Sequence, residues 1–432
     1  MPSRKNKGGL LARVNFPLYT LQMLTSRHIL VGGGGGSSKT GVANGFEIFE
    51  LSHNGVQFVA EEVTRHETGP AVVMNCATYN DRKKSWIVAG QENHCQLYNV
   101  NNKIVNLENG EIIKKAANVK KDNVRHRKSS ETKEEARSNK EKVQEVKDDN
   151  CNVKCKKLQL VIKPADSVQT DFSEDESLQR IVRISNDGKL MATGGTDGCI
   201  RIWKFPQLQK LHDLKAHKKE IDDIDFSPDG NSLITIAKDG KAILWNVTNG
   251  SQSKELTWSC PNNTKYMYKR CRFRISEENK SSNQLFLLSN ATTGKDPSYL
   301  QLWDTESENI IKSVAYKETL SALAVSDDGK FVAVGTMFSG SVDIYIAFSL
   351  RRALHVPGAH NMFVTGLEFL PTKLDGPAVT SNSEISVISI SIDNRICIHS
   401  IPFRHTIPFW FAILLIILSI CAAFMFCSYL GI

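Results

Sequence analysis

Three turns with a similar sequence, an apolar residue and a serine followed two residues later by Asp-Gly, recur along the middle of the chain. They lie at residues 184–188 (ISNDG), 226–230 (FSPDG) and 325–329 (VSDDG). The first two closing glycines stand 42 residues apart, and the third follows after a further 99 residues, a little more than two such intervals. Apolar residues alternate with polar ones around each turn, which is typical of β-strands. A period of about 40 to 45 residues with four short strands per unit predicts the blades of a β-propeller.

Tryptophans follow the turns at a constant distance. Asp197 precedes Trp203 by six residues, Asp239 precedes Trp245 by six, and a Trp-Asp dipeptide occurs at 303–304. Each Asp-Gly turn therefore leads into a strand that ends in tryptophan. This pattern resembles the WD40 family, and the resemblance implies an all-β, WD40-type propeller.

The chain departs from the WD40 pattern in two ways. Gly-His signatures are absent, and Ala-His pairs at 216–217 and 359–360 are the nearest forms. Gly195 and Ala237 stand two residues before a turn aspartate, where a small hydroxyl residue is expected. We therefore expect the usual hydrogen-bonded tetrad to be incomplete and the blades to be held mainly by apolar packing.

Seven units can be counted, which predicts a seven-bladed propeller over residues 1–402. The last unit uses residues 364–369, 385–392 and 395–401, and a long apolar segment begins almost directly afterwards. Its outermost strand has two solutions. Either this blade has three strands, or residues near 10–14 close the ring.

A charged insertion interrupts the second unit at residues 99–157. Lys, Glu, Asp and Arg dominate it, and such a segment buries too little apolar surface to offset its ordering entropy, so we expect it to be disordered. Its basic cluster at 120–128 is largely cancelled by acidic residues from Glu131 onward. A solvated linker is therefore favoured over a basic patch for acidic lipid or nucleic acid.

The carboxyl-terminal segment predicts a membrane anchor. Residues 407–430 contain no charge, and a helix of that length spans roughly 36 Å, enough to cross a hydrocarbon core. Residues 403–406 form a short juxtamembrane linker in which Arg404 and His405 lie directly before the span. Basic residues favour the cytosolic side. We therefore expect a single-pass protein with a cytosolic propeller, a lumenal carboxyl terminus and reduced cysteines.

A run of five glycines stands out in the first unit, in the segment VGGGGGSSKTGVANG at residues 31–45. It is a long loop between two predicted strands. A phosphate-binding loop would require glycine before Lys39 and a helix after Thr40, whereas Ser38 precedes the lysine and Gly41 and Gly45 break any helix. The pattern therefore does not predict a nucleotide hydrolase.

The glycine loop, the degenerate seven-bladed propeller and the anchor together resemble one family. It comprises the endoplasmic-reticulum guanine-nucleotide exchange factors for the Sar-type small GTPase, whose animal members are called prolactin regulatory element-binding proteins. The resemblance covers nearly the whole chain outside the insertion. It implies an exchange factor without covalent chemistry that starts COPII vesicle formation at the endoplasmic-reticulum membrane.

In that family the loop projects from the propeller and engages the GTPase around a potassium ion. Carried over to this chain, the resemblance implies a potassium ion held by the backbone carbonyls of Gly34, Gly35, Gly36 and Ser37. The residues implied to form the GTPase-contacting loop are Gly32, Gly33, Gly34, Gly35, Gly36, Ser37, Ser38, Lys39, Thr40 and Asn44.

Two other classes of function stay open. A propeller can act as a non-catalytic scaffold for coat or cargo proteins, and the 120–128 cluster is a candidate for nucleic-acid binding. The net charge of +8 is spread along the chain and alone argues little for nucleic acid. His94, His217 and His360 stand at equivalent-looking turns, where we expect structural rather than catalytic roles.

Overall fold

The protein is described by a computed structural model. It describes residues 9–36, 41–108, 111–112, 155–260, 264–275, 284–293, 296–372, 379, 383–403 and 409–431. The chain divides into two units, one formed by residues 1–100 and 162–432 and the other by residues 101–161.

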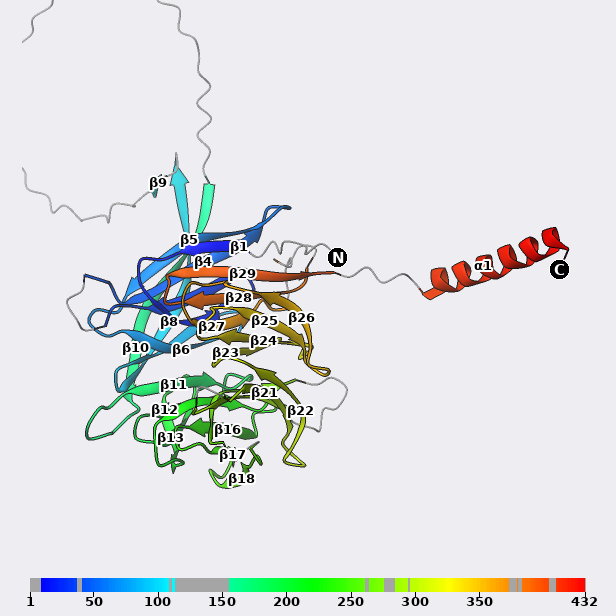
Figure 1. The fold of residues 1–432 in the computed structure, drawn as a ribbon. Coiled ribbons are helices and arrows are strands. Elements are labelled where there is room, and N and C mark those ends of the chain that lie inside the picture. Colours follow the sequence, from blue (N-terminus) through cyan, green and yellow to red (C-terminus); the bar gives the residue numbers. More distant parts are fainter. Residues whose placement is uncertain are drawn as a thin grey trace, which may run out of the picture. The chain divides into compact units, whose positions relative to one another are not determined.

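Within these ranges the strands form seven sheets, each with four strands side by side (Figure 1). The first two blades contain β2 (Leu18–Met23), β3 (His28–Gly33), β4 (Gly45–His53) and β5 (Phe58–Glu67), then β6 (Val73–Asn80), β7 (Ser85–Gln91), β8 (His94–Glu108) and β10 (Cys155–Gln169). Blades three and four contain β11 (Gln179–Ile184), β12 (Leu190–Gly195), β13 (Cys199–Lys204) and β14 (Gln209–Lys215), then β15 (Ile221–Phe226), β16 (Ser232–Ala237), β17 (Ala242–Asn246) and β18 (Gln252–Leu256). Blades five and six contain β19 (Tyr266–Arg274), β20 (Gln284–Ala291), β21 (Ser298–Asp304) and β22 (Asn309–Tyr316), then β23 (Leu320–Val325), β24 (Phe331–Thr336), β25 (Val342–Ile346) and β26 (Arg351–Val356).

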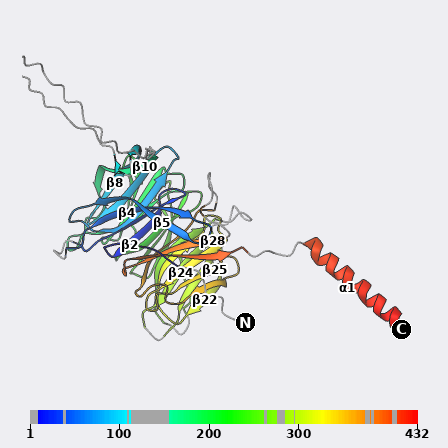
Figure 2. The same ribbon diagram turned by 90° about the horizontal axis from the view of Figure 1, so that it is seen from above.

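The seventh blade closes the ring with the start of the chain. Its first three strands are β27 (Val364–Phe369), β28 (Ser383–Ser391) and β29 (Arg395–Pro402), and β1 (Gly9–Arg13) pairs antiparallel with β29. The second of the two solutions left open by the sequence is therefore the one adopted. Figure 2 shows β28 of this blade near β4 and β5 of the first blade.

The first strand of each blade faces the axis of the ring, and each contacts the first strands of the two neighbouring blades, with β27 returning to β2. Apolar clusters fill the space between neighbouring sheets, as in the cluster of Ile221, Ile224 and Trp245 between the third and fourth blades. All seven inner strands have a register shift near their start: it lies at the second residue in six of them and at the fourth residue, Lys269, in β19. The prediction of a seven-bladed all-β propeller is confirmed.

The boundaries of the predicted insertion differ from the observed strands. β8 continues to Glu108, β9 (Glu111–Ile112) pairs with its end, and β10 already begins at Cys155. Residues 99–108 and 155–157 are thus strand rather than disordered segment, because β8 and β10 hydrogen-bond to each other as neighbours in one sheet. Residues 113–154, where disorder is predicted, lie outside the described residues.

The predicted anchor forms helix α1 (Phe409–Leu430). Its Phe409–Cys427 stretch has a mean hydropathy of 2.7 and is long and apolar enough to cross a membrane. Residues 404–408 lie outside the described residues.

The hydrogen-bonded tetrad is complete in the fourth blade, so the expectation that it would be incomplete is wrong there. The His217 imidazole contacts the Asp239 carboxylate through Nδ1 (3.1 Å) and the Thr235 hydroxyl through Nε2 (2.9 Å). The indole of Trp245 donates to the same hydroxyl at 2.9 Å. The hydroxyl residue, Thr235, stands four residues before the aspartate rather than two. The alanine at position 237 therefore does not indicate an incomplete tetrad.

The seventh blade builds the same network with a second histidine in place of tryptophan. His360 contacts Asp393 (3.2 Å) and the Ser389 hydroxyl (2.8 Å), and Nε2 of His399 lies 2.9 Å from that hydroxyl. His399 and Trp245 both stand ten residues after the hydroxyl residue of their blade. His217 and His360 therefore have the structural role predicted for them.

The buried His399 makes the stability of the propeller sensitive to acid. Burial, with the nearby His360 adding to it, lowers the pKa of His399 to about 3, whereas the unfolded value is 6.5. Below pH 6.5 the unfolded chain therefore binds a proton that the folded chain does not, and stability falls as the pH decreases towards 3. We expect this group alone to cost about 1 kcal/mol between pH 6.5 and 5.5, because the unfolded imidazole goes from half to almost fully protonated over that interval. Urea unfolding at both pH values should show a smaller loss in His399→Trp, and equal losses would contradict the assignment.

Candidate functional site

The glycine run lies only partly in a loop. Gly32 and Gly33 are the last residues of β3, Gly45 is the first residue of β4, and residues 34–44 connect the two strands. Gly32, Gly33 and Gly34 are buried. These three glycines therefore shape the base of the loop, and their contact with a partner stays a prediction.

The buried glycines leave no room for a side chain. A Cβ at Gly33 would lie 1.9 Å from the Pro17 carbonyl oxygen, and one at Gly34 would lie 2.1 Å from Oδ1 of Asn44. Gly34 also has a φ of +145°, which L-residues rarely adopt, and its N–H donates to the Pro17 carbonyl at 3.2 Å. The backbone of the loop base is packed directly against the Pro17 backbone and against Asn44.

Asn44 fastens the two ends of the loop to each other. Its buried amide accepts a hydrogen bond from the Gly36 N–H (2.9 Å) and donates to the Gly36 carbonyl (3.1 Å). The same Nδ2 donates to the carbonyls of Gly69 and Pro70, both at 3.0 Å, in the turn between β5 and β6. The two hydrogens of Nδ2 are thus shared among three carbonyl groups, and this one side chain connects the loop to the next blade.

Gly36 and Gly41 stand in open space. A Cβ at Gly36 (φ +81°) or at Gly41 (φ +76°) would meet no atom within 4 Å. These two positions need glycine for their backbone conformation rather than for space. Gly35 is half-buried, and Ser37, Ser38, Lys39 and Thr40 lie outside the described residues.

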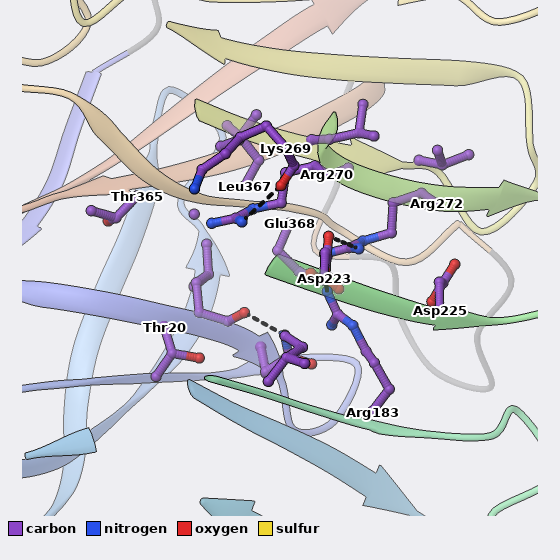
Figure 3. A pocket seen from close by; sticks show the side chains of 18 of the residues that line it. Thr20, Arg183, Asp223, Asp225, Lys269, Arg270, Arg272, Thr365, Leu367 and Glu368 are labelled. Atoms are coloured by element: carbon purple, nitrogen blue, oxygen red, sulfur yellow. Dashed lines mark hydrogen bonds and ion pairs between the residues drawn. The ribbon is translucent and has the colours of Figure 1, made fainter. Parts of the chain in front are cut away.

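The sequence analysis missed a second feature, a charged cavity of about 650 Å³ lined by the inner strands. Asp223 on β15 lies 2.6 Å from Nη1 of Arg272 on β19 and 3.8 Å from Nη2 of Arg183 on β11 (Figure 3). Lys269 and Arg270 stand beside this group, and Lys269 pairs with Asp222 at 3.0 Å. The sequence feature that could have indicated this cavity is the run KRCRFR at residues 269–274, in which basic residues are interspersed along β19.

Two carboxyl groups in the same cavity differ from Asp223 in lying further from a guanidinium. Burial raises the pKa of Asp225 to about 7, against the opposing charge of Arg183. Burial likewise raises the pKa of Glu368 to about 7, again with Arg183 opposing it. At neutral pH each of these two carboxyl groups is therefore protonated in a fraction of the molecules.

Comparison with known proteins assigns the chain to a family. The WD40 model, described as WD domain, G-beta repeat, matches residues 175–204 and 208–246, within the third and fourth blades. The guanine nucleotide-exchange factor SEC12 of Mus musculus is 34% identical over 420 residues, which cover 95% of each chain. This chain belongs to the SEC12 family. The SEC12 protein of Rattus norvegicus is likewise 34% identical over 95% of both chains.

A plant relative matches a shorter part of this SEC12-family chain. SEC12-like protein 1 of Arabidopsis thaliana is 30% identical over 208 residues, 46% of this chain and 48% of its own length. The family resemblance drawn from the glycine loop, the propeller and the anchor is therefore confirmed at the level of the family. The roles of individual loop residues are not decided by these similarities.

Proposed function

We propose that this chain is a membrane-anchored guanine-nucleotide exchange factor that loads a Sar-type small GTPase with GTP and so starts COPII vesicle formation. The observation that carries the proposal is the 34% identity to the SEC12 exchange factors across 95% of the chain. The loop described above is the docking element that we propose, because hydrogen bonds hold its base and a Cβ at Gly36 or at Gly41 would meet no atom within 4 Å.

Exchange requires differential binding and no covalent chemistry. A factor that binds the nucleotide-free GTPase more tightly than the loaded form shifts the population towards release. A loop that is already held in shape loses little conformational entropy on docking. Here Asn44 holds the base, and the residues from Gly35 through Thr40 and Gly41 form the part offered to the partner, with Lys39 supplying a positive charge for acidic residues of the GTPase.

We also propose a potassium ion at the loop, held by the backbone carbonyls of Gly34, Gly35, Gly36 and Ser37. The donor chemistry fits, because backbone carbonyl oxygens are ligands that potassium accepts. The Gly36 carbonyl also accepts a hydrogen bond from Nδ2 of Asn44 at 3.1 Å, which fixes one of the four proposed ligands. When bound, the ion supplies a charge that carbonyl oxygens can coordinate in place of water.

We propose that helix α1 anchors the protein in the endoplasmic-reticulum membrane, with the propeller in the cytosol and the carboxyl terminus in the lumen; its length and apolar composition support the anchoring. Activation at that surface would bring the loaded GTPase and the COPII coat to the membrane where vesicles form. In this orientation the glycosylation sequons at Asn246, Asn249, Asn262 and Asn290 carry no glycan. A glycan on any of them would reverse the topology.

The test is nucleotide release from a Sar-type GTPase by the full-length protein in liposomes. We expect the protein to accelerate release of a fluorescent GDP, and alanine at Ser38, Lys39 and Thr40 to remove most of that acceleration. Thermal stability of this variant should stay within about 1 kcal/mol, as for other surface substitutions. The acceleration should also be weaker in choline chloride than in potassium chloride at equal ionic strength.

Each element of the proposal can fail separately. Binding of the GTPase without any nucleotide preference would indicate a scaffold rather than an exchange factor. Full activity in the triple-alanine variant would remove the loop from the mechanism. Equal rates in potassium and choline would remove the ion and leave the loop.

A further inference from the structure

Two neighbouring turns of the propeller each carry a Met-Phe pair. Met337-Phe338 lies between β24 and β25, and Met362-Phe363 lies between β26 and β27. Phe338 is 75% exposed and Met362 is 46% exposed, whereas Met337 and Phe363 are half-buried and line the central cavity. The pairs thus reach from the cavity outward to solvent.

The two turns open on the same face as the glycine loop. Strands within a blade alternate in direction, so the connections from second to third strand and from one blade to the next emerge at one end. The glycine loop and the turn at Phe338 are connections of the first kind, and the turn at Met362 is of the second kind. Connections from third to fourth strand, such as the one that carries Phe348, emerge at the opposite end.

Hydrogen bonds hold the two turns against each other. The N–H of His360 donates to the Gly340 carbonyl at 3.0 Å, and a Cβ at Gly340 would lie 2.8 Å from the Met362 carbonyl oxygen. The N–H of Asn361 donates to the carboxylate of Asp393 at 3.0 Å. The backbone that carries Phe338 and Met362 is therefore fixed before any partner arrives.

The Met-Phe turns are also directly continuous with the base of the glycine loop. Thr365, two residues after Phe363, donates its hydroxyl proton to the Leu18 carbonyl at 2.8 Å. Leu18 is the register partner of Gly33 at the end of β3. One hydrogen bond and one strand pair thus connect the seventh blade to the loop of the first.

We propose that Phe338 and Met362 form a second docking point for the GTPase, which packs an apolar surface of its nucleotide-free form against them while the glycine loop is engaged. This inference rests on the proposed exchange function. Exposed aromatic and methionine side chains are enriched in protein interfaces, and methionine adapts to the shape of a partner. Further round the same face, the turn between β14 and β15 carries the exposed Lys218 and Lys219, so the surface there is charged rather than apolar.

The test is the exchange assay with the full-length protein in liposomes and a titrated Sar-type GTPase. We expect the double substitution Phe338→Ala and Met362→Ala to lower kcat/KM for exchange by roughly tenfold to a hundredfold, as loss of interface anchors does. Most of the loss should appear in KM, because the loop itself is intact. Phe338→Tyr should retain most of the activity, since it keeps the ring.

Phe348→Ala is the matched control, because Phe348 is 63% exposed at the opposite end of the sixth blade. It should leave exchange unchanged. A double variant as active as the wild type, with wild-type thermal stability, would overturn the docking point while the exchange function stands. Absence of exchange by the wild-type protein itself would instead overturn the proposed function. A loss of activity by the control equal to that of the double variant would also overturn the docking point.

Discussion

Asn44→Ala should reduce nucleotide exchange at least a hundredfold, because the substitution removes the fastening of the whole loop. The amide contacts four backbone groups: its oxygen accepts from the Gly36 N–H, and the two hydrogens of Nδ2 are shared among the carbonyls of Gly36, Gly69 and Pro70. Without it the loop gains conformational freedom that docking must remove again. A hundredfold loss corresponds to about 2.7 kcal/mol of transition-state stabilisation.

Asn44→Asp should be at least as damaging as Asn44→Ala. The carboxylate can still accept from the Gly36 N–H, but its second oxygen would face the carbonyl oxygens that now accept from Nδ2. The measurement is fluorescent GDP release, with thermal unfolding to verify that the propeller stays folded.

Asn54→Ala is the matched control in the same blade. Asn54 accepts hydrogen bonds from the N–H groups of Val56 and Gln57 in the exposed turn between β4 and β5, at the opposite end of the strands. This variant should exchange nucleotide at the wild-type rate. Wild-type exchange by Asn44→Ala would show that the loop does not need its fastening to act.

The blades could be predicted because their turns and strands recur at a regular interval in the sequence. The six-residue spacing from Asp197 to Trp203 recurs from Asp239 to Trp245 because the third and fourth blades repeat one turn and strand. The closing strand Gly9–Arg13 has no such period, and its pairing with β29 is a contact between the two ends of the propeller, which local pattern does not specify. The sequence therefore left two solutions open at that blade.

The glycine run shows why the site was harder to predict than the fold. Consecutive glycines are typical of a flexible loop, yet Gly33 and Gly34 are glycine because Pro17 and Asn44 occupy the space of their side chains. Those contacts arise only when the chain has folded. Asp223 and Arg272 could not be predicted for the same reason. Nothing in the sequence distinguishes them from other charged residues, and they meet only in the folded propeller, on inner strands of neighbouring blades.

Asp223→Ala should lower the stability of the propeller by roughly 3 to 5 kcal/mol, the usual cost of breaking a buried charge pair by removing one partner. The carboxylate is fully buried and joins three blades, since it contacts Arg272 at 2.6 Å and Arg183 at 3.8 Å and accepts the N–H of Cys271 at 3.2 Å. Its loss leaves two largely buried guanidinium groups without this partner.

Urea unfolding of the full-length protein in detergent measures the Asp223→Ala effect as a lower midpoint. Asp223→Asn should be milder, because the amide oxygen still accepts from the Cys271 N–H while the attraction to both arginines is lost. Glu255→Ala, which breaks the half-exposed pair with Lys241 at 2.8 Å, is the control and should cost no more than about 1 kcal/mol. Equal midpoints for Asp223→Ala and Glu255→Ala would mean that water in the cavity already screens the arginines, and that apolar packing between the sheets alone holds these three blades together.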